Sequence, residues 1–348
     1  MYFRQFLNDD HGCASYLIAS GQTGEAAVVD PALEIDQYEA ILAKRGYTLK
    51  YVIDTHVHAD HISGARQLAG NHLAELVLFE TAQVAYPFRP LADGEELVLG
   101  EVRLRAMHTP GHRPELMSIL VINLDRAPEP SMVLTGDSLL VGDAGRPDFG
   151  GGDAAAQYDT IRKLLALPGW VAVFPGHFEG PCGKSMCGRP STTIGFEQQF
   201  NPFANLTRDE FITAISDVAA RPLNMTAIEA TNRGTGDLFW AMPRGDQQVT
   251  EIDIATAMQE LESANPPLLL DVREPDEYDS GHIPGAINLP QAELAQRIDE
   301  LPQDEPVLLI CEAGKRSLRA AQFLKQRGFA KPVTISGGTA AWRERQTE

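Results

Sequence analysis

Short apolar runs closed by glycine or proline recur along the first half of the chain. Four of them end in a residue that commonly binds metals: YVIDTH at His56, VRLRAMHTPGH at His112, SMVLTGD at Asp137 and VAVFPGH at His177. Runs of this length, rich in Val, Leu and Ile, predict buried strands that leave their sheet at these points. Because side chains at strand ends can converge on one edge of a sheet, we expect these residues to lie close together.

Helical patterns accompany these strands. The segment ADHISGARQLAG fits a helix outside the sheet that stops near Gly70. The segment LTRDEFITAISDVAA predicts an amphipathic helix with Thr207 as its N-cap. We expect this second helix to close the first domain.

A new alternation of strands and helices begins after AMPRGDQQVT. PLLLDVRE reads as a buried strand, and PVLLICEAGKRSLRAAQFLKQRGF reads as a strand, a loop and a helix from near Ser317 to Gly328. Such alternation predicts a parallel sheet with helices on both faces. Since 348 residues exceed the usual size of one core, we expect two α/β domains, residues 1–240 and 246–348.

Composition narrows the range of partners. The net charge of −19 argues against binding nucleic acid or an anionic membrane. The N-terminal residues do not resemble a signal peptide, and no apolar run is long enough to span a membrane, so we expect a soluble cytoplasmic protein. The four cysteines do not follow a secreted disulfide pattern.

The stretch THVHADHISG concentrates metal-type side chains. His56, His58, Asp60 and His61 occupy six positions, and imidazole and carboxylate groups at this density are typical of metal sites. A solvated acidic loop is the plain alternative. The other strand-end residues, His112, Asp137 and His177, favour a metal site.

The motifs HxHxDH, TPGH, TGD and PGH, in this order, resemble the metallo-beta-lactamase superfamily over about residues 1–235. The resemblance implies an αββα sandwich with a metal site at a sheet edge. In one member, glyoxalase II, two metals use ligands that match His56, His58, His112 and Asp137 at one site, and Asp60, His61, His177 and the shared Asp137 at the other. In another, persulfide dioxygenase, one Fe(II) is held by ligands that match His56, His112 and Asp137 alone. The remaining four residues would then be hydrogen-bonding partners.

Arg146 favours the dioxygenase. It lies in GDAGRPDFGGGD, in a GRxDF context that is similar to the GRTDF segment of persulfide dioxygenases, whose arginine lines the substrate pocket. A guanidinium there suits an anionic substrate, while an ion pair with Asp148 or Asp153 is the structural alternative.

The segment after His177, FEGPCGKSMCGRPSTTIG, departs from the family, which carries a tyrosine-containing segment there. We expect Lys184 and Arg189 to supply cationic contacts for the carboxylates of glutathione. Cys182 and Cys187 are either reactive thiols near the substrate or buried, inert side chains.

In the second domain the chemistry lies in CEAGKRS. Cys311 leaves a strand and enters a tight loop before a helix, where backbone N–H groups, the helix N-terminus and two cations stabilise a thiolate. This favours a nucleophile over a small core residue. With LLLDVREPDEYDSGHIPGAINLP, the segment resembles a rhodanese domain, a sulfurtransferase. The resemblance implies that Cys311 carries the transferred sulfur. It also implies that the loop surrounding this sulfur is formed by Glu312, Ala313, Gly314, Lys315 and Arg316.

The whole chain thus resembles a persulfide dioxygenase–rhodanese fusion. The resemblance implies one Fe(II) per chain, oxidation of glutathione persulfide by O₂ to sulfite and glutathione, and sulfur transfer between thiosulfate and glutathione. It also implies a homodimer. The alternatives are a binuclear glutathione thioesterase with an appended sulfurtransferase and a non-enzymatic sulfur sensor.

Overall fold

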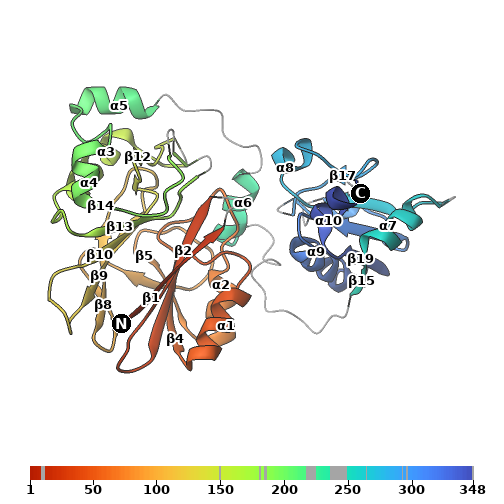
Figure 1. Cartoon of the computed structure of the whole chain (residues 1–348), viewed down its shortest axis with the longest axis horizontal. Coiled ribbons are helices and arrows are strands. Elements are labelled where there is room, and N and C mark those ends of the chain that lie inside the picture. Colours follow the sequence, from red (N-terminus) through yellow and green to blue (C-terminus); the bar gives the residue numbers. More distant parts are fainter. Residues whose placement is uncertain are drawn as a thin grey trace. The chain divides into compact units, whose positions relative to one another are not determined.

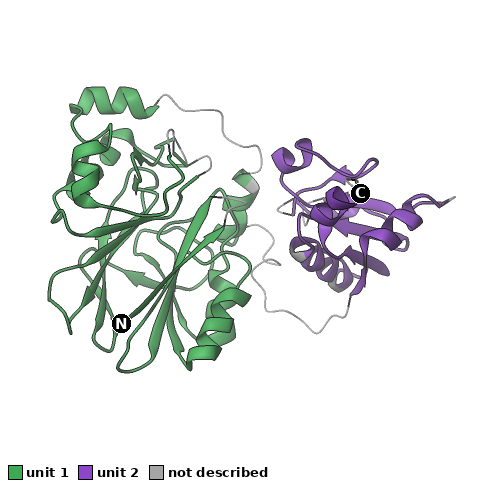
Figure 2. Cartoon of the chain, in the orientation of Figure 1, with its two compact units in different colours: residues 1–236 green, residues 237–348 purple. Residues whose placement is uncertain are grey.

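The computed structural model describes residues 1–8, 12–148, 150–179, 182–183, 186–216, 225–235, 249–263, 265–291, 293–294 and 297–346. The chain divides into two compact units, Met1–Gly236 and Asp237–Glu348, which Figure 2 colours separately. Each unit has its own sheets and its own hydrophobic core. The predicted junction at residues 241–245 lies outside the described residues.

Unit 1 contains two mixed sheets (Figure 1). The first has the order β1-β2-β3-β4-β5-β6, formed by Tyr2–Asn8, Cys13–Ala19, Glu25–Val29, Thr48–Ile53, Glu75–Phe79 and Arg89–Leu91. The second has the order β14-β13-β10-β9-β8-β7, formed in that order by Thr192–Thr193, Ala172–Pro175, Met132–Gly136, Met117–Asn123, Val102–His108 and Glu96–Leu99. A short ribbon joins β11 (Leu139–Leu140) to β12 (Asp143–Ala144).

The two sheets pack face to face over a core shared by both. Ile53 of β4, Leu104 of β8 and Leu134 of β10 are all buried in this core. Further apolar clusters join each sheet to the helices on its outer face. These helices are α1 (Asp36–Arg45) and α2 (Ala65–His72) on the first sheet, and α3 (Ala154–Leu165), α4 (Ile194–Phe200) and α5 (Arg208–Ser216) on the second. The predicted αββα sandwich is confirmed.

Two details of the helices differ from the prediction. Helix α2 continues two residues beyond Gly70. Thr207 does precede α5, and its backbone N–H donates to Glu210 Oε2 at 2.9 Å, but α5 does not end the unit. Another helix, α6 (Met225–Arg233), follows, so the expectation that α5 closes the domain is wrong. Helix α6 buries Met225 and Ile228 on one face, together with the polar residues Thr231 and Asn232.

Unit 2 is built around a parallel sheet of the order β15-β19-β18-β16-β17, formed by Thr250–Ile252, Lys331–Ile335, Pro306–Ile310, Leu268–Asp271 and Ile287–Asn288. Its described helices are α7 (Ile254–Leu261), α8 (Pro275–Asp279), the 3₁₀ turn η2 (Ile298–Glu300), α9 (Lys315–Gln326) and α10 (Gly338–Gln346). The predicted parallel sheet is confirmed. Helix α9 begins two residues before Ser317, directly after Gly314, whose positive φ of 89° ends the loop.

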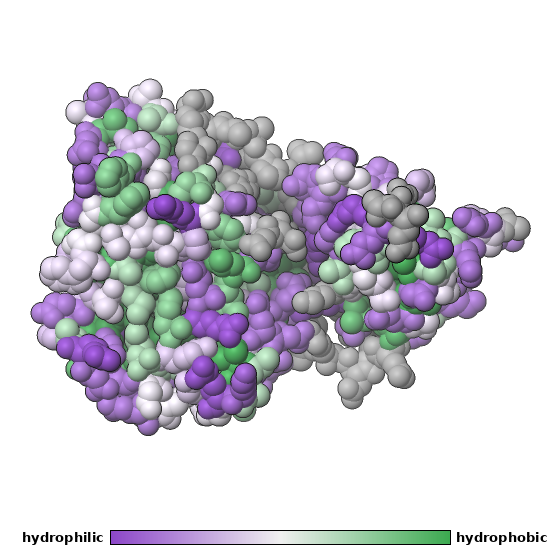
Figure 3. Space-filling view, in the orientation of Figure 1, coloured by the Kyte–Doolittle hydropathy of each residue, from purple (hydrophilic) through white to green (hydrophobic). Residues whose placement is uncertain are grey.

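The surface view in Figure 3 shows hydrophilic residues over much of the visible face, with apolar residues between them. Among the helices that the structure describes, none has the length and apolar character needed to cross a membrane.

Candidate functional site

The strand ends of unit 1 bring the predicted metal-type residues together. Strand β4 of the first sheet leads to His56, while β8 and β10 of the second lead to His112 and Asp137. Oδ2 of Asp137 lies 3.8 Å from Nε2 of His56 and 3.6 Å from Nε2 of His112. All three residues are buried. The site therefore lies between two sheets, and the expectation of a single sheet edge needs this correction.

Glycines allow these loops to approach one another. At Gly136 the backbone is left-handed, with φ 48°, and a Cβ would lie 2.7 Å from Oγ1 of Thr55. At Gly176 a Cβ would lie 2.7 Å from Oδ1 of Asp137. Larger side chains at either position would push apart the turns that carry the site.

The triad of His56, His112 and Asp137 fits a metal ion. Nε2 of His56 and Oδ2 of Asp137 are buried atoms with no hydrogen-bond partner, a costly state that a cation relieves. Burial lowers the pKa of both histidines, so they are neutral, the form that binds metals. Metal–ligand bonds of about 2.0–2.2 Å allow atoms at these separations to share one ion.

His177 lies beside the triad and contacts carboxylates through both ring nitrogens. Its Nδ1 is 2.8 Å from Oδ1 of Asp137, and its Nε2 is 2.8 Å from Oδ2 of Asp60. Burial opposes a charged ring, but Asp137 raises the pKa of His177 well above its ordinary value. The ring therefore donates to both carboxylates. Nδ1 of His61 is also 2.8 Å from Oδ2 of Asp60.

His58 belongs to a separate buried group. Its Nε2 lies 3.2 Å from Oδ1 of Asp30, and its Nδ1 has no hydrogen-bond partner. Ligand-type atoms of Asp30, Asp54 and His58 lie within 4.8 Å of one another. The seven predicted residues thus gather in one region, as a triad surrounded by hydrogen-bonded partners.

Cys13 also lies in this region, and the sequence reasoning missed it. Its Sγ is 3.2 Å from Nε2 of His177 and 3.8 Å from Nδ1 of His61. Burial raises the pKa of this thiol, but His177 and His61 outweigh that effect and lower it below its ordinary value. Residues 13 and 177 meet through an isolated antiparallel bridge. No local spacing could have indicated that contact.

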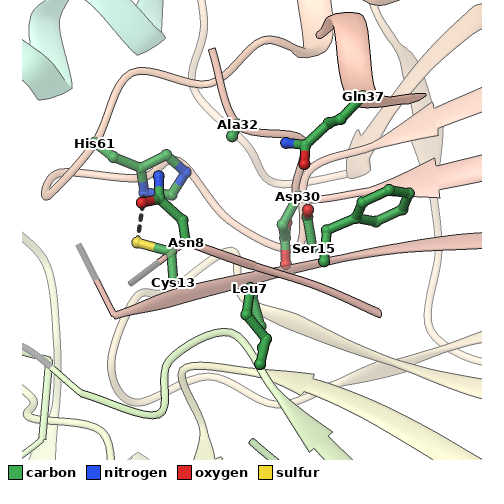
Figure 4. Close-up of a pocket in the computed structure, with 10 residues that line it drawn as sticks. Leu7, Asn8, Cys13, Ser15, Asp30, Ala32, Gln37 and His61 are labelled. Atoms are coloured by element: carbon green, nitrogen blue, oxygen red, sulfur yellow. Dashed lines mark hydrogen bonds between the residues drawn. The ribbon is translucent and has the colours of Figure 1, made fainter. Parts of the chain in front are cut away.

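A pocket opens beside Cys13, and Figure 4 shows the thiol facing His61 across one side of it. Other lining residues come from β1, β2, the loop before α1 and the first turn of α1. They are Phe6, Leu7, Asn8, Ala14, Ser15, Asp30, Ala32 and Gln37.

Arg146 pairs with its near neighbour in the chain. Its Nε donates to Oδ1 of Asp148 at 2.7 Å and its Nη2 to Oδ2 at 2.9 Å. Asp153, the other candidate partner, instead accepts backbone N–H groups as the N-cap of α3. The backbone carbonyl of Arg146 lies 2.8 Å from Nδ1 of His112, so this segment also orients a member of the triad.

The candidate residues in the loop after His177 differ in their burial and in their contacts. Cys182 is buried, and its ligand atom and those of Asp137 and His177 lie within 4.8 Å of one another. Burial raises its pKa well above the ordinary value for a thiol. Cys187 is exposed, and the guanidinium of Arg189 lies over the ring of Phe196. Lys184 lies outside the described residues.

In unit 2, Cys311 is buried at the start of the loop between β18 and α9. The backbone N–H of Ser317 points to its Sγ at 3.4 Å. Glu312, Ala313 and Gly314 complete the loop, and α9 starts at Lys315. The sulfur therefore lies at the N-terminal end of α9, where the helix dipole favours an anion.

Ion pairs fix the surroundings of this loop. Both terminal nitrogens of Arg316 lie 2.6 Å from the carboxylate of Glu277. Glu312 accepts from Thr339 and is paired with Arg343. Asp271 and Arg273 form a buried ion pair, with Nη2 of Arg273 2.7 Å from Oδ2 of Asp271.

Comparisons with known proteins agree with both units. Residues 8–177 match the metallo-beta-lactamase superfamily and residues 254–345 match the rhodanese-like domain. Bovine (Bos taurus) mitochondrial persulfide dioxygenase ETHE1 is 31% identical over 214 residues, which span 60% of this chain and 78% of that protein. The chain belongs to the metallo-beta-lactamase superfamily. Its C-terminal unit is a rhodanese-like domain, and both resemblances noted in the sequence are confirmed.

Two further comparisons extend this result. A human hydroxyacylglutathione hydrolase-like protein is 31% identical over 221 residues, 64% of this chain and 70% of that protein. The crystal structure of a metallo-beta-lactamase from Staphylococcus aureus covers 97% of this chain and 99% of its own, with a TM-score of 0.70 and 27% identity. The chain is therefore similar to a persulfide dioxygenase and to a hydroxyacylglutathione hydrolase-like protein at the same identity of 31%.

Proposed function

We propose that unit 1 is a mononuclear iron persulfide dioxygenase that converts glutathione persulfide, O₂ and water to glutathione and sulfite. One observation carries the choice of a mononuclear centre. Nε2 of His56 and Oδ2 of Asp137 have no partner and face His112. On the residues that would hold a second ion, Oδ2 of Asp60, Nδ1 of His61 and both ring nitrogens of His177 are instead hydrogen-bonded to one another or to Asp137.

The protein prepares each histidine of the triad through its second nitrogen. His112 donates its Nδ1–H to the carbonyl of Arg146 at 2.8 Å. His56 lies 3.0 Å from Oγ1 of Thr55, and the Thr55 hydroxyl donates to Asp30 at 2.9 Å. Both imidazoles are thereby held as the tautomer whose Nε2 lone pair faces the centre.

Fe(II) bound to a triad of two imidazoles and one carboxylate supplies open positions for a sulfur anion and for O₂. His177 orients the carboxylate by binding Oδ1 of Asp137, which leaves Oδ2 for the metal. Burial of all three ligands keeps bulk water away from the reacting groups.

We assign Arg146, Lys184 and Arg189 to the anionic groups of glutathione persulfide, on the strength of their charge and their places in the sequence. Because Arg146 already holds Asp148, its contact with substrate requires sharing or exchanging that partner.

Unit 2 is proposed to transfer sulfane sulfur through Cys311. The thiolate attacks the outer sulfur of thiosulfate, the S–S bond breaks, and sulfite leaves with the bonding electron pair. Cys311 then carries a persulfide, and the thiolate of glutathione attacks its outer sulfur to give glutathione persulfide and restore Cys311. The N-terminus of α9 and Arg316 stabilise the anionic sulfur in each state.

The two activities share glutathione persulfide and sulfite, which explains their presence in one chain. The deciding experiment measures O₂ uptake by iron-loaded protein when glutathione persulfide is added, with sulfite assayed in the same vessel. We expect uptake with matching sulfite. Iron-containing protein that consumes no O₂ would remove the dioxygenase proposal.

A glutathione thioesterase is the second candidate, because a hydroxyacylglutathione hydrolase-like relative matches at 31% identity. It would use two metals and need no O₂, with His58, Asp60, His61 and His177 as additional ligands. Hydrolysis of lactoylglutathione by protein holding two metals per chain would favour it. Thioester hydrolysis neither forms nor consumes a persulfide, so a thioesterase would share no intermediate with the sulfur transfer at Cys311.

A further inference from the structure

Helix α6 lies beyond the residues that match the metallo-beta-lactamase superfamily, yet it holds the loop that carries His56 and His58. Asn232 is buried, with 4% exposure. Its Nδ2 donates to the backbone carbonyls of His58 and His61, each at 2.8 Å, and its Oδ1 accepts the N–H of Ser63 at 3.0 Å. One side chain thus forms hydrogen bonds with three backbone groups of the loop from His56 to Ser63, here called the metal loop.

The same helix also reaches the loop of His112. Arg113 is fully buried next to this histidine, and its Nη2 donates to Oε1 of Glu229 at 2.7 Å. At the start of α6, Met225 packs with Ala59 and Cys182. Helix α6 therefore contacts the loops of two triad histidines that come from different sheets.

Asn232 is itself fixed in place from the opposite side. The hydroxyl of Tyr86 donates to its backbone carbonyl at 2.8 Å, and Arg66 donates to the carbonyl of the preceding Thr231 at 2.5 Å. The N–H of Ala85 donates to the carbonyl of Arg233 at 2.7 Å. A side chain anchored in this way can hold a loop to a defined geometry.

We propose that Asn232 is a positioning residue for the metal centre, which holds the loop from His56 to Ser63 in its metal-binding conformation. Without its amide, three buried backbone groups lose their side-chain partner, and the loop must shift to find others. Replacing a residue that holds metal ligands in place through hydrogen bonds typically weakens metal binding by about 10–100-fold. The inference rests on the triad of the proposed function but not on the reaction performed there.

The test compares two buried asparagines in the full-length protein. Asn201 also makes three hydrogen bonds, to Asp143, Glu197 and Phe203, and contacts no part of the metal loop through its side chain. Co²⁺ serves as a spectroscopic probe, and the absorbance that His112→Ala removes defines binding at the triad. We expect Asn232→Ala to raise the Co²⁺ dissociation constant by about 10-fold or more, and Asn201→Ala to leave it within about twofold.

Equal affinity of the two variants would overturn the inference, whatever their thermal stabilities. Should Asn232→Ala fail to fold, Asn232→Asp decides, because it keeps the acceptor for Ser63 but removes the donor to both carbonyls. Wild-type affinity in Asn232→Asp would equally overturn the role of the amide. If wild-type protein bound no Co²⁺ at the triad, the metal centre of the proposed function would fail and this inference with it.

Discussion

Asp137 presents a different oxygen to each side of the metal-type cluster. Its Oδ1 lies 2.8 Å from Nδ1 of His177, while Oδ2 faces His56 and His112 without a hydrogen-bond partner. A carboxylate divided in this way can bind one ion through Oδ2 while His177 fixes its orientation. In a binuclear centre, His177 would itself be a ligand. Metal stoichiometry therefore distinguishes the two roles of His177.

We expect His177→Gln to keep one metal per chain but to bind it about 10-fold more weakly, since the orienting contact to Asp137 is lost. Metal analysis after equilibration in graded chelator gives both numbers. His72→Gln, on half-exposed His72 at the end of α2, is the matched control and should match wild type. A change from two metals in wild type to one in His177→Gln would instead establish a binuclear centre.

Replacing His112 by alanine removes one of three ligands. We expect iron affinity to fall more than about 100-fold, beyond the effect of an outer partner, and O₂ uptake with glutathione persulfide to disappear. Thiosulfate sulfurtransfer by the same preparation should stay at the wild-type level, because Cys311 belongs to the other unit. Retained iron and retained O₂ uptake would remove His112 from the proposed centre.

The sequence predicts those parts of the site that depend on local order. Hydrophobic runs that end in His56, His112 and Asp137 mark strand ends, but it is the packing of the two sheets, which the sequence does not show, that brings His56 to the other two. The loop after Cys311 is equally local, because strand, glycine and helix follow directly in the chain. These features are visible without knowing how distant segments pair.

The sequence does not predict contacts between segments that lie far apart in the chain. Cys13 meets His177 through strand pairing across 164 residues, and Asn232 meets His58 across 174. The sequence offered two possible ion-pair partners for Arg146, namely Asp148 and Asp153. Asp153 caps a helix and Asp148 takes the ion pair, a choice made by backbone geometry that composition does not reveal.

Cys311→Ser should abolish sulfur transfer while sparing O₂ consumption. A hydroxyl is a far weaker nucleophile than a thiolate, so we expect thiosulfate sulfurtransferase activity below about 1% of wild type. Mass spectrometry after incubation with thiosulfate should find an added sulfur atom on the peptide of Cys311 in wild type. Cys187→Ser, at an exposed cysteine of unit 1, serves as control. Full activity in Cys311→Ser would place the transfer on another thiol.

Glu274 gives unit 2 a predictable pH dependence. Burial, reinforced by Glu277 and Asp276, raises the pKa of Glu274 to about 7, from an ordinary 4.5, although Arg316 opposes the shift. Between these values the folded state keeps a proton that the unfolded chain has lost. The free energy of unfolding therefore falls as pH rises from about 4.5 to about 7, and the contribution of this carboxyl is constant outside that window.

Replacing Glu274 by glutamine removes the titration but keeps an oxygen for the capping box at the start of α8. We expect the variant to lose this part of the pH dependence and to exceed wild type at pH 8 by on the order of 1–2 kcal/mol, after allowance for partial solvent contact. Denaturant unfolding of the full chain, followed through sulfurtransferase activity, measures the difference at pH 5 and pH 8. Identical pH profiles in the two proteins would mean that Glu274 is ionised in the folded state throughout this range, with Arg316 outweighing its burial.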